Sequence, residues 1–333
     1  MILKTILFLS INNIIFAESF FNNYPKIKST NCCMNNNDYN FKCSQWDGKK
    51  IDTLIFEGGG VRAVVYSGAI KKMEEVDMIK CVKNIAGTSS GAQTAALLCC
   101  GYKSNEIKSV LRMAPWKKIL DGGFTFRGIY FLLTKFGFYN PNFLESYLDH
   151  LIFLKTGIRA TTFEQLYNIS KIHLKIGVCS LKDQKFKYID YIEYPEMPVA
   201  KGLLASSSIP LLFTTTEYCN EIFTDGGLVG NLPTTSFPNN NCLALTLFSK
   251  NEFKHSKENP KNLISFAKIV LNILVDYSRE IYSSKNRYIK NIDFIEIYTG
   301  DVGILDTNMN ENIINELSEY GYFAVESFLN RKF

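Results

Sequence analysis

Short apolar runs that end in glycines or small polar residues alternate along the chain with longer segments of helical periodicity. The first run covers residues 51–56 and ends at three consecutive glycines, which predicts a strand that leads into a tight loop. Residues 64–80 then place apolar side chains on one helical face, residues 82–86 form a second short strand, and a small-residue helix over 92–100 follows. This order predicts parallel strands with helices on both faces of the sheet.

The rest of the chain is predicted to continue the same α/β domain. Residues 103–170 are expected to be mostly helical, with aromatic-rich loops such as Phe124–Phe138 that either wall or cover a substrate site or pack as ordinary loops. Further elements are expected as strands at His173–Ser180, Phe186–Tyr191, Cys242–Phe248 and Ile292–Tyr298, and as closing helices at Leu263–Tyr282 and Ile313–Leu329. No repeat or linker divides this segment, so we predict one domain over residues 51–333.

The first 50 residues differ in pattern from the domain. Lys4, a mostly apolar stretch and Ala17 predict a cleaved secretory signal over residues 1–17, and therefore a secreted protein or one in the secretory pathway. An uncleaved anchor or an ordinary N-terminal strand is the alternative, although the run is short against the roughly 20 residues of a membrane span. Residues 18–50 form an asparagine-rich leader with three cysteines that would be able to pair after export, whereas the cysteines inside the domain are expected to be free thiols.

Composition and charge exclude some classes of function. Hydrophobic residues make up 46% of the chain and charged residues 21%, as in ordinary globular proteins. The net charge of +5 is spread along the chain, which argues against a nucleic-acid-binding arm but suits contact with an anionic membrane. The cysteines and histidines show no metal-binding spacing, so we expect no metal.

A serine lies between two glycines in Gly87-Thr88-Ser89-Ser90-Gly91, where the second predicted strand turns into a helix. Such a turn holds the serine hydroxyl exposed, and Gly87 and Gly91 are needed because a side chain would clash across it. The N-terminus of the following helix favours negative charge that develops nearby. Ser89 is therefore a candidate nucleophile, with an ordinary serine- and glycine-rich turn as the alternative.

Three consecutive glycines, Gly58, Gly59 and Gly60, follow the first predicted strand and precede Arg62. Acyl transfer passes through an oxyanion that needs backbone N–H donors, and glycines let the main chain approach it closely. A dinucleotide loop would need glycine where the chain has Ala63, and a Walker-type phosphate loop would need Gly-Lys-Ser/Thr, which is absent. The pattern favours an oxyanion loop over nucleotide binding.

Asp225 is the third candidate. It follows a predicted strand at Glu221–Thr224 and precedes Gly226 and Gly227. An Asp-Gly pair alone usually marks a turn, but a carboxylate presented at a strand end and held by glycines can reach a serine on another loop.

Histidine is scarce: the chain has only His150, His173 and His255. A Ser-His-Asp triad needs a histidine at a strand end that faces the serine. The first histidine lies in a predicted helix, the second begins an apolar strand, and the third lies in a lysine-rich loop. Asp225 is therefore the best candidate to accept the Ser89 proton directly.

Four ordered motifs together resemble those of the patatin-like phospholipases: Phe56-Glu57-Gly58-Gly59-Gly60-Val61-Arg62, Gly87-Thr88-Ser89-Ser90-Gly91, Ala205-Ser206-Ser207-Ser208-Ile209-Pro210 and Asp225-Gly226-Gly227. The resemblance runs from about Ile51 to the final helix. It implies a three-layer α/β/α fold with a central, mostly parallel sheet. It also implies metal-independent hydrolysis of phospholipid or related acyl esters, of the phospholipase A or lysophospholipase type, by a Ser-Asp dyad without a cofactor.

The resemblance also implies a role for each matched position. Ser89 would be the nucleophile and Asp225 the base; the oxyanion region would be Gly58, Gly59, Gly60 and Arg62, the nucleophile turn Gly87 and Gly91, and the support of the base loop Gly226 and Gly227. Ala63 departs from the family, which often has glycine there, and we expect only a slight shift of the loop. The expected partner is membrane or micellar phospholipid, with peripheral membrane contact and no nucleic acid or nucleotide. The alternative is a lipid- or membrane-binding protein that kept the fold and lost turnover.

Overall fold

The computed structural model describes residues 50–120, 125–140, 142–249 and 291–331, together with a few residues between 259 and 277. All of them belong to one compact unit, Cys32–Phe333. The predicted signal and almost all of the predicted leader lie outside the described residues, as does the other unit, Met1–Asn31. Of the helix expected over 263–282, the described residues between 265 and 277 are helical.

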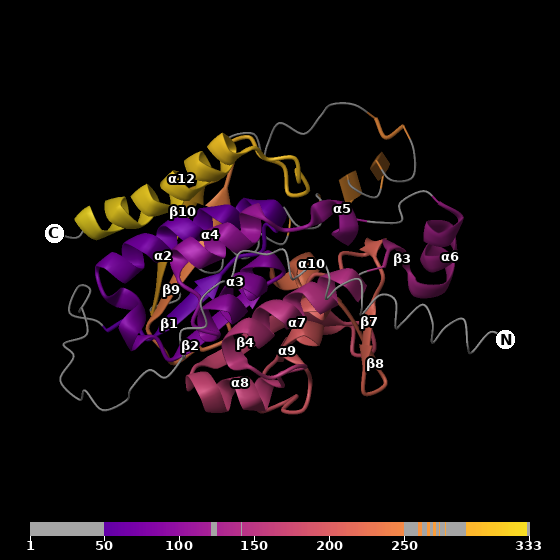
Figure 1. Ribbon diagram of the computed structural model, residues 1–333, viewed down its shortest axis with the longest axis horizontal. Coiled ribbons are helices and arrows are strands. Elements are labelled where there is room, and N and C mark those ends of the chain that lie inside the picture. Colours follow the sequence, from indigo (N-terminus) through magenta and orange to yellow (C-terminus); the bar gives the residue numbers. More distant parts are fainter. Residues whose placement is uncertain are drawn as a thin grey trace. The chain divides into compact units, whose positions relative to one another are not determined.

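An eight-stranded mixed sheet forms the centre of this unit (Figure 1). Its members are β1 (Thr53–Phe56), β2 (Asn84–Thr88), β4 (His173–Ser180), β5 (Lys185–Ile189), β7 (Thr216–Tyr218), β8 (Glu221–Asp225), β9 (Cys242–Phe248) and β10 (Ile292–Tyr298). Strands β10, β9, β1, β2 and β4 lie in that order and are parallel, whereas β5 and β8 run antiparallel to β4 and β7 pairs antiparallel with β8. The prediction of a mostly parallel sheet is confirmed.

One edge of β4 is shared by two strands that meet end to end. Strand β5 pairs with Ile176–Ser180 and so occupies one edge of β4. The other edge therefore takes β2 as far as Gly177 and β8 from Val178 onward. Because β8 runs opposite to β2, the carboxyl ends of these two strands face each other.

Helices flank the sheet in the three-layer arrangement that was predicted. Helix α2 (Val65–Glu75) packs against α12 (Glu311–Asn330), α3 (Ser90–Cys99) packs on β1, β2 and β4, and α9 (Val199–Ser206) packs on β4 and β8 with α7 (Asn142–Thr156) against it. Figure 1 shows α2 and α12 along one side of the strands and α8 and α9 along the other. The other described helices are η1 (Gly60–Val64), η2 (Met78–Cys81), α4 (Ser104–Arg112), α5 (Trp116–Ile119), α6 (Phe126–Lys135), α8 (Phe163–Ser170) and α10 (Gly227–Gly230).

Three local expectations are corrected. The helix predicted over 64–80 is broken after α2, because Asp77 adopts a left-handed backbone conformation with φ 56°. The segment Phe124–Phe138 is no loop in its described part: it forms α6 and then β3 (Gly137–Tyr139), which pairs with β6 (Leu211–Phe213) in a separate parallel sheet. Cys81 is disulfide-bonded, with its partner outside the described residues; the other cysteines that the structure describes, Cys99, Cys100, Cys179, Cys219 and Cys242, are free thiols.

The apolar runs seen in the sequence are explained by burial. Leu54, Ile55 and Phe56 of β1 are fully buried, and so are most residues of the neighbouring β9, because helices cover both faces of these central strands. Within the described part of the chain, no helix has the length and apolar character needed to cross a membrane.

Candidate active site

The serine turn between β2 and α3 is a strained connection. Ser89 has φ 53° and ψ −125°, a backbone conformation that residues other than glycine rarely adopt. A Cβ atom at Gly87 would lie 2.4 Å from the Gly91 carbonyl group, and one at Gly91 would lie 2.5 Å from the Phe56 carbonyl oxygen. Both glycines are therefore required by close backbone approach, as the sequence predicted, and Ser89 remains partly exposed above the sheet.

The strand register brings Ser89 and Asp225 together. Thr88, the last residue of β2, is opposite Gly177 on β4, and Asp225, the last residue of β8, is opposite Val178 on the same edge. The two strand ends are thus one register position apart, which places the Ser89 side chain near enough to the Asp225 carboxylate to lower its pKa.

The carboxylate of Asp225 is buried, with 4% of the residue exposed. Burial raises the pKa of Asp225 to about 7, opposed by hydrogen bonds from the Gly227 amide and the Ser89 side chain. The Gly227 N–H donates to Asp225 Oδ1 at 2.7 Å, and a Cβ at Gly226 would lie 2.5 Å from the Gly177 carbonyl oxygen. A group held in this way accepts a proton readily near neutral pH.

The glycine loop lies beside this pair, and two of its three amides already have partners. The Gly58 N–H donates to the Asn231 carbonyl oxygen at 3.1 Å, and the Gly59 N–H donates to Ser90 Oγ at 3.0 Å. Gly60 adopts φ 57° and lines the same cavity as Ser89. Its amide is therefore the one best placed to approach an oxyanion next to the serine.

Arg62 follows the glycine loop and hydrogen-bonds both to that loop and to a distant segment of the chain. Its Nε donates to the Val302 carbonyl oxygen at 2.6 Å, and its backbone N–H donates to the Gly59 carbonyl oxygen at 3.2 Å. Arg62 thus ties the glycine loop to the segment between β10 and α12. That segment contacts the loop again where the Val61 N–H donates to Ile304.

Glu57 and Asn231 form a buried link to which the sequence analysis gave no role. Asn231 Nδ2 donates to Glu57 Oε1 at 3.0 Å and to the Gly58 carbonyl oxygen at 2.9 Å, and Glu57 Oε2 accepts the Leu247 N–H at 2.7 Å. In the sequence, Glu57 directly precedes the three glycines, and Asn231 begins an Asn-Leu-Pro string after Asp225. Residue type alone did not indicate that they would meet.

The serine string at 206–208 connects the serine turn to the base strand. Ser206 Oγ accepts the Ser89 N–H at 2.8 Å and donates to the Gly177 carbonyl oxygen at 2.7 Å. The Ser208 carbonyl oxygen accepts the Asp225 N–H at 3.0 Å. These contacts hold Ser89 and Asp225 in position relative to each other.

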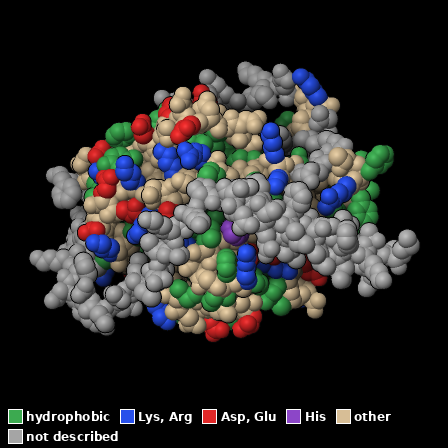
Figure 2. Space-filling view, in the orientation of Figure 1, with side chains coloured by type: hydrophobic (Ala, Val, Ile, Leu, Met, Phe, Trp, Pro, Cys, Tyr) green, Lys and Arg blue, Asp and Glu red, His purple; other side chains and the backbone are tan. Residues whose placement is uncertain are grey.

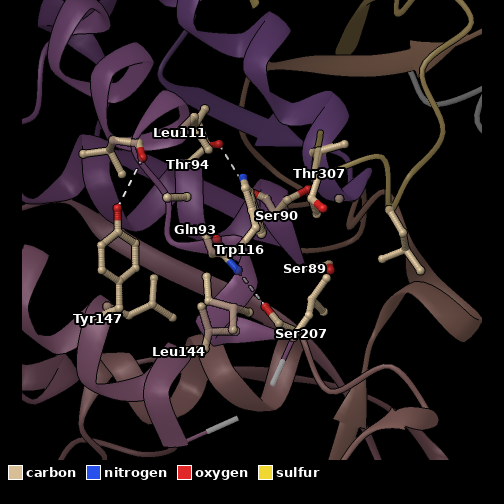
Figure 3. Close-up of a pocket in the computed structure, with 18 of the residues that line it drawn as sticks. Ser89, Ser90, Gln93, Thr94, Leu111, Trp116, Leu144, Tyr147, Ser207 and Thr307 are labelled. Carbon is tan, nitrogen blue, oxygen red and sulfur yellow. Dashed lines mark hydrogen bonds between the residues drawn. The ribbon is translucent and has the colours of Figure 1, made fainter. Parts of the chain in front are cut away.

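An apolar cavity opens beside Ser89 (Figure 3). Its lining includes Leu97 of α3, Val110 of α4, Ile119 of α5 and Leu144, Leu148 and Leu151 of α7. Polar groups are found on its serine side, where Gln93 Nε2 donates to Ser207 Oγ at 3.0 Å. The cavity therefore combines an apolar interior with a reactive, polar end, as sites for ligands with apolar chains do.

Neither histidine that the structure describes lines this cavity. His173 is opposite Asn84 at the start of β4, four residues or roughly 13 Å along the strand from Gly177, and its Nε2 lies 2.9 Å from Asp190 Oδ2. His150 is on α7, and His255 lies outside the described residues. Among the described residues, no group of three or more His, Cys, Asp or Glu side chains is arranged to hold a metal ion.

The chain is thus a three-layer α/β/α protein in which a serine turn, a glycine loop and an apolar cavity lie together. A family model described as patatin-like phospholipase matches residues 54–238, which is more than half of the chain. The chain therefore belongs to the patatin-like phospholipase family, whose members are lipid hydrolases.

Two relatives and one solved structure are similar to this chain. YqhO of Bacillus subtilis is 27% identical over 298 residues, which cover 83% of this chain and 97% of YqhO. The probable lipid hydrolase 463L of Invertebrate iridescent virus 6 is 26% identical over 203 residues, which cover 59% of this chain and 66% of 463L. The crystal structure of VipD from Legionella pneumophila has the same fold, with a TM-score of 0.56 at 18% identity over 87% of this chain and 70% of VipD.

Proposed function

We propose that this protein is a lipid acyl hydrolase of the phospholipase A or lysophospholipase type, with Ser89 and Asp225 as a catalytic dyad. The observation that carries the proposal is the placement of Ser89 and the buried Asp225 carboxylate at two facing strand ends, with Ser89 on the wall of an apolar cavity. The family assignment supports hydrolysis of lipid esters.

Acylation begins when Asp225 accepts the hydroxyl proton as Ser89 Oγ forms a bond to the ester carbonyl carbon. The carbonyl oxygen becomes an oxyanion, which the Gly60 amide is positioned to stabilise. Collapse of this intermediate breaks the bond to the alcohol, which leaves with the proton from Asp225. The fatty acyl group remains on Ser89 as an ester.

Deacylation repeats the same steps with water as the nucleophile. Asp225 accepts a proton from water, the resulting hydroxide attacks the acyl ester, and Ser89 Oγ regains its proton as the fatty acid leaves. No step needs a metal ion or an organic cofactor, because Asp225 supplies the base and peptide amides supply the electrophilic groups.

The substrate is an ester with a long apolar acyl chain. The apolar cavity next to Ser89 is suited to hold that chain, and the polar head group would remain on the open side of the serine turn. Such lipids are present in membranes and micelles, so the enzyme acts on their surface. Membrane phospholipid is the proposed partner.

Labelling by a fluorophosphonate probe, which reacts with activated serines, tests the proposal directly. The purified protein should be labelled at Ser89, and Ser89→Ala should abolish both labelling and release of fatty acid in a screen of lipid classes. The matched control is Ser146→Ala, which changes an exposed serine of α7. A folded protein that binds lipid but is neither labelled nor active would support the alternative, a binding protein without turnover.

A further inference from the structure

Helix α6 exposes an apolar face that most helices bury. Phe126, Ile129, Tyr130 and Leu133 have the i, i+3, i+4, i+7 spacing of a single helical face, which normally packs on a core. Here all four side chains are exposed, Phe126 to 96% and Leu133 to 74%. Phe136, directly after the helix, is exposed as well. A continuous exposed patch of this kind marks an interaction surface. We name these five residues the α6 stripe.

The charged residues of α6 itself have one sign. Arg127 and Lys135 are exposed, and each lies over the ring of Phe131, at 5.3 Å and 5.7 Å from its centroid. The sequence from Thr125 to Asn140 contains no acidic residue. Figure 2 shows hydrophobic side chains beside Lys and Arg side chains at the end of the view that carries α6 in Figure 1. An apolar face on a helix whose other face carries cations is typical of helices that lie in the surface of an anionic bilayer.

Backbone hydrogen bonds connect α6 to the cavity. The Thr215 N–H donates to the Lys135 carbonyl oxygen at 3.2 Å, and Tyr139 of β3 pairs with Phe213 of β6. Phe213 lines the cavity that also contains Ser89. Helix α6 is therefore connected through β3 and β6 to the wall of the cavity beside Ser89.

We infer that the α6 stripe, with Arg127 and Lys135, is the surface by which this protein docks on anionic phospholipid membranes. The apolar side chains insert between lipid head groups, and the two cations contact the negative surface. This inference rests on the proposed function for its purpose, since docking brings the cavity to its substrate, but it is tested independently of catalysis.

Vesicle sedimentation measures the docking. All variants are made in the full chain with Ser89→Ala, so that the vesicles stay intact, and are mixed with phosphatidylcholine vesicles with or without phosphatidylserine. The apolar variant is Phe126→Ser with Leu133→Ser, and the charge variant is Arg127→Gln with Lys135→Gln. Matched controls are Phe323→Ser, which changes an exposed phenylalanine on α12, and Lys182→Gln with Lys185→Gln, which changes two exposed lysines.

We expect the apolar variant to reduce binding to phosphatidylserine vesicles at least about tenfold. The charge variant should reduce it about fivefold for each cation removed, and only when phosphatidylserine is present. The controls should bind like the Ser89→Ala parent. With Ser89 restored, the same α6 variants should hydrolyse soluble 4-nitrophenyl butyrate at the parental rate, because none of their changed residues lines the cavity.

Unchanged vesicle binding by the α6 variants, or equal losses in the controls, would overturn the inference. The inference would also be overturned if the α6 stripe caused self-association on size-exclusion chromatography but no binding to vesicles. The stripe would then bind a second copy of the chain and not a membrane. Failure of the proposed function gives a different result: no hydrolysis of the soluble ester by the native protein, whatever its vesicle binding.

Discussion

Asn231 Nδ2 donates to Glu57 Oε1 at 3.0 Å, and this buried contact links the loop after Asp225 to the loop of glycines. Asn231→Ala should lower the free energy of unfolding by about 1–3 kcal/mol, because it removes a donor from a buried carboxylate. Activity should fall as well, because the Gly58 carbonyl oxygen also loses the Asn231 side-chain amide that donates to it. Thermal unfolding and kcat of the purified variants measure both effects.

Asn231→Asp gives a sharper version of this test. It keeps the size of the side chain but places a second carboxylate against Glu57, so it should be more destabilising than Asn231→Ala at neutral pH. Adding Glu57→Gln removes the repulsion and should recover part of the lost stability. If Asn231→Asp proved as stable as the native protein, the Glu57–Asn231 contact would contribute nothing to the stability of the fold.

Asp225→Asn should make the folded protein more stable at alkaline pH while abolishing turnover. Burial raises the pKa of Asp225 to about 7 from its usual 3.8. Between these values the folded state retains a proton that the unfolded state releases, so native stability decreases as pH rises through this window. Asparagine does not ionise, so the variant avoids the free-energy cost of ionising a buried carboxyl group, which is on the order of a few kcal/mol. The melting temperature of the variant should exceed that of the native protein at pH values above about 7, and the difference should vanish below about pH 4. A variant that melts lower than the native protein at alkaline pH would contradict the raised pKa.

Activity should increase with pH as Asp225 ionises, with a midpoint near 7. An imidazole base would give a similar profile, so variants decide between a dyad and a triad. Asp225→Asn should lower kcat about a thousandfold or more, close to Ser89→Ala. His150→Ala, His173→Ala and His255→Ala should each keep most of the activity, and one folded histidine variant as inactive as Ser89→Ala would refute the dyad.

Ser89→Gly and Ser89→Ala should both be inactive but should differ in stability. The φ of 53° and ψ of −125° at this position are accessible to glycine and strained for alanine. We expect Ser89→Gly to be more stable than Ser89→Ala by about 1 kcal/mol, although glycine usually destabilises. Urea unfolding of the two variants measures the difference, and the opposite order would mean that the turn carries no strain.

Ala114→Trp should change which acyl chains are accepted. Ala114 lines the cavity with Trp116 and Leu120, so a larger side chain there reduces the space for a long chain. Hydrolysis of 4-nitrophenyl palmitate should fall at least about tenfold relative to 4-nitrophenyl butyrate. The ratio of the two kcat/KM values reports this effect independently of overall activity, and an unchanged ratio would show that the acyl chain binds elsewhere.

Local sequence pattern was sufficient to predict most of the sheet. The strands at His173–Ser180, Cys242–Phe248 and Ile292–Tyr298 have the predicted bounds. Cys242–Phe248 is an almost continuous apolar run because this central strand is buried on both faces, whereas Ile292–Tyr298 is at an edge of the sheet and has the exposed Glu296 among its apolar residues. The glycines of the serine turn were predicted for the reason that the structure gives, close approach of the main chain.

Contacts between segments that are far apart in the sequence could not be predicted from local sequence pattern. The meeting of β2 and β8 on one edge of β4 depends on which strands pair, and no local periodicity encodes that choice. Ser206 illustrates the same limit: a serine in a serine-rich string has many possible roles, and its contact with the Ser89 amide spans 117 residues. Helix α6 was missed because its aromatic side chains give the same signal in a loop as on an exposed helix.

The separation of the α6 stripe from the Glu57–Asn231 link has an evolutionary consequence. Substitutions at Glu57 or Asn231 disturb a buried polar contact, so selection for folding restricts them. Substitutions at Phe126 or Leu133 change side chains that contact mainly water, so folding permits them freely. A lineage that carries this domain can therefore redirect an unchanged hydrolytic chemistry to a different lipid surface through a few positions of one helix.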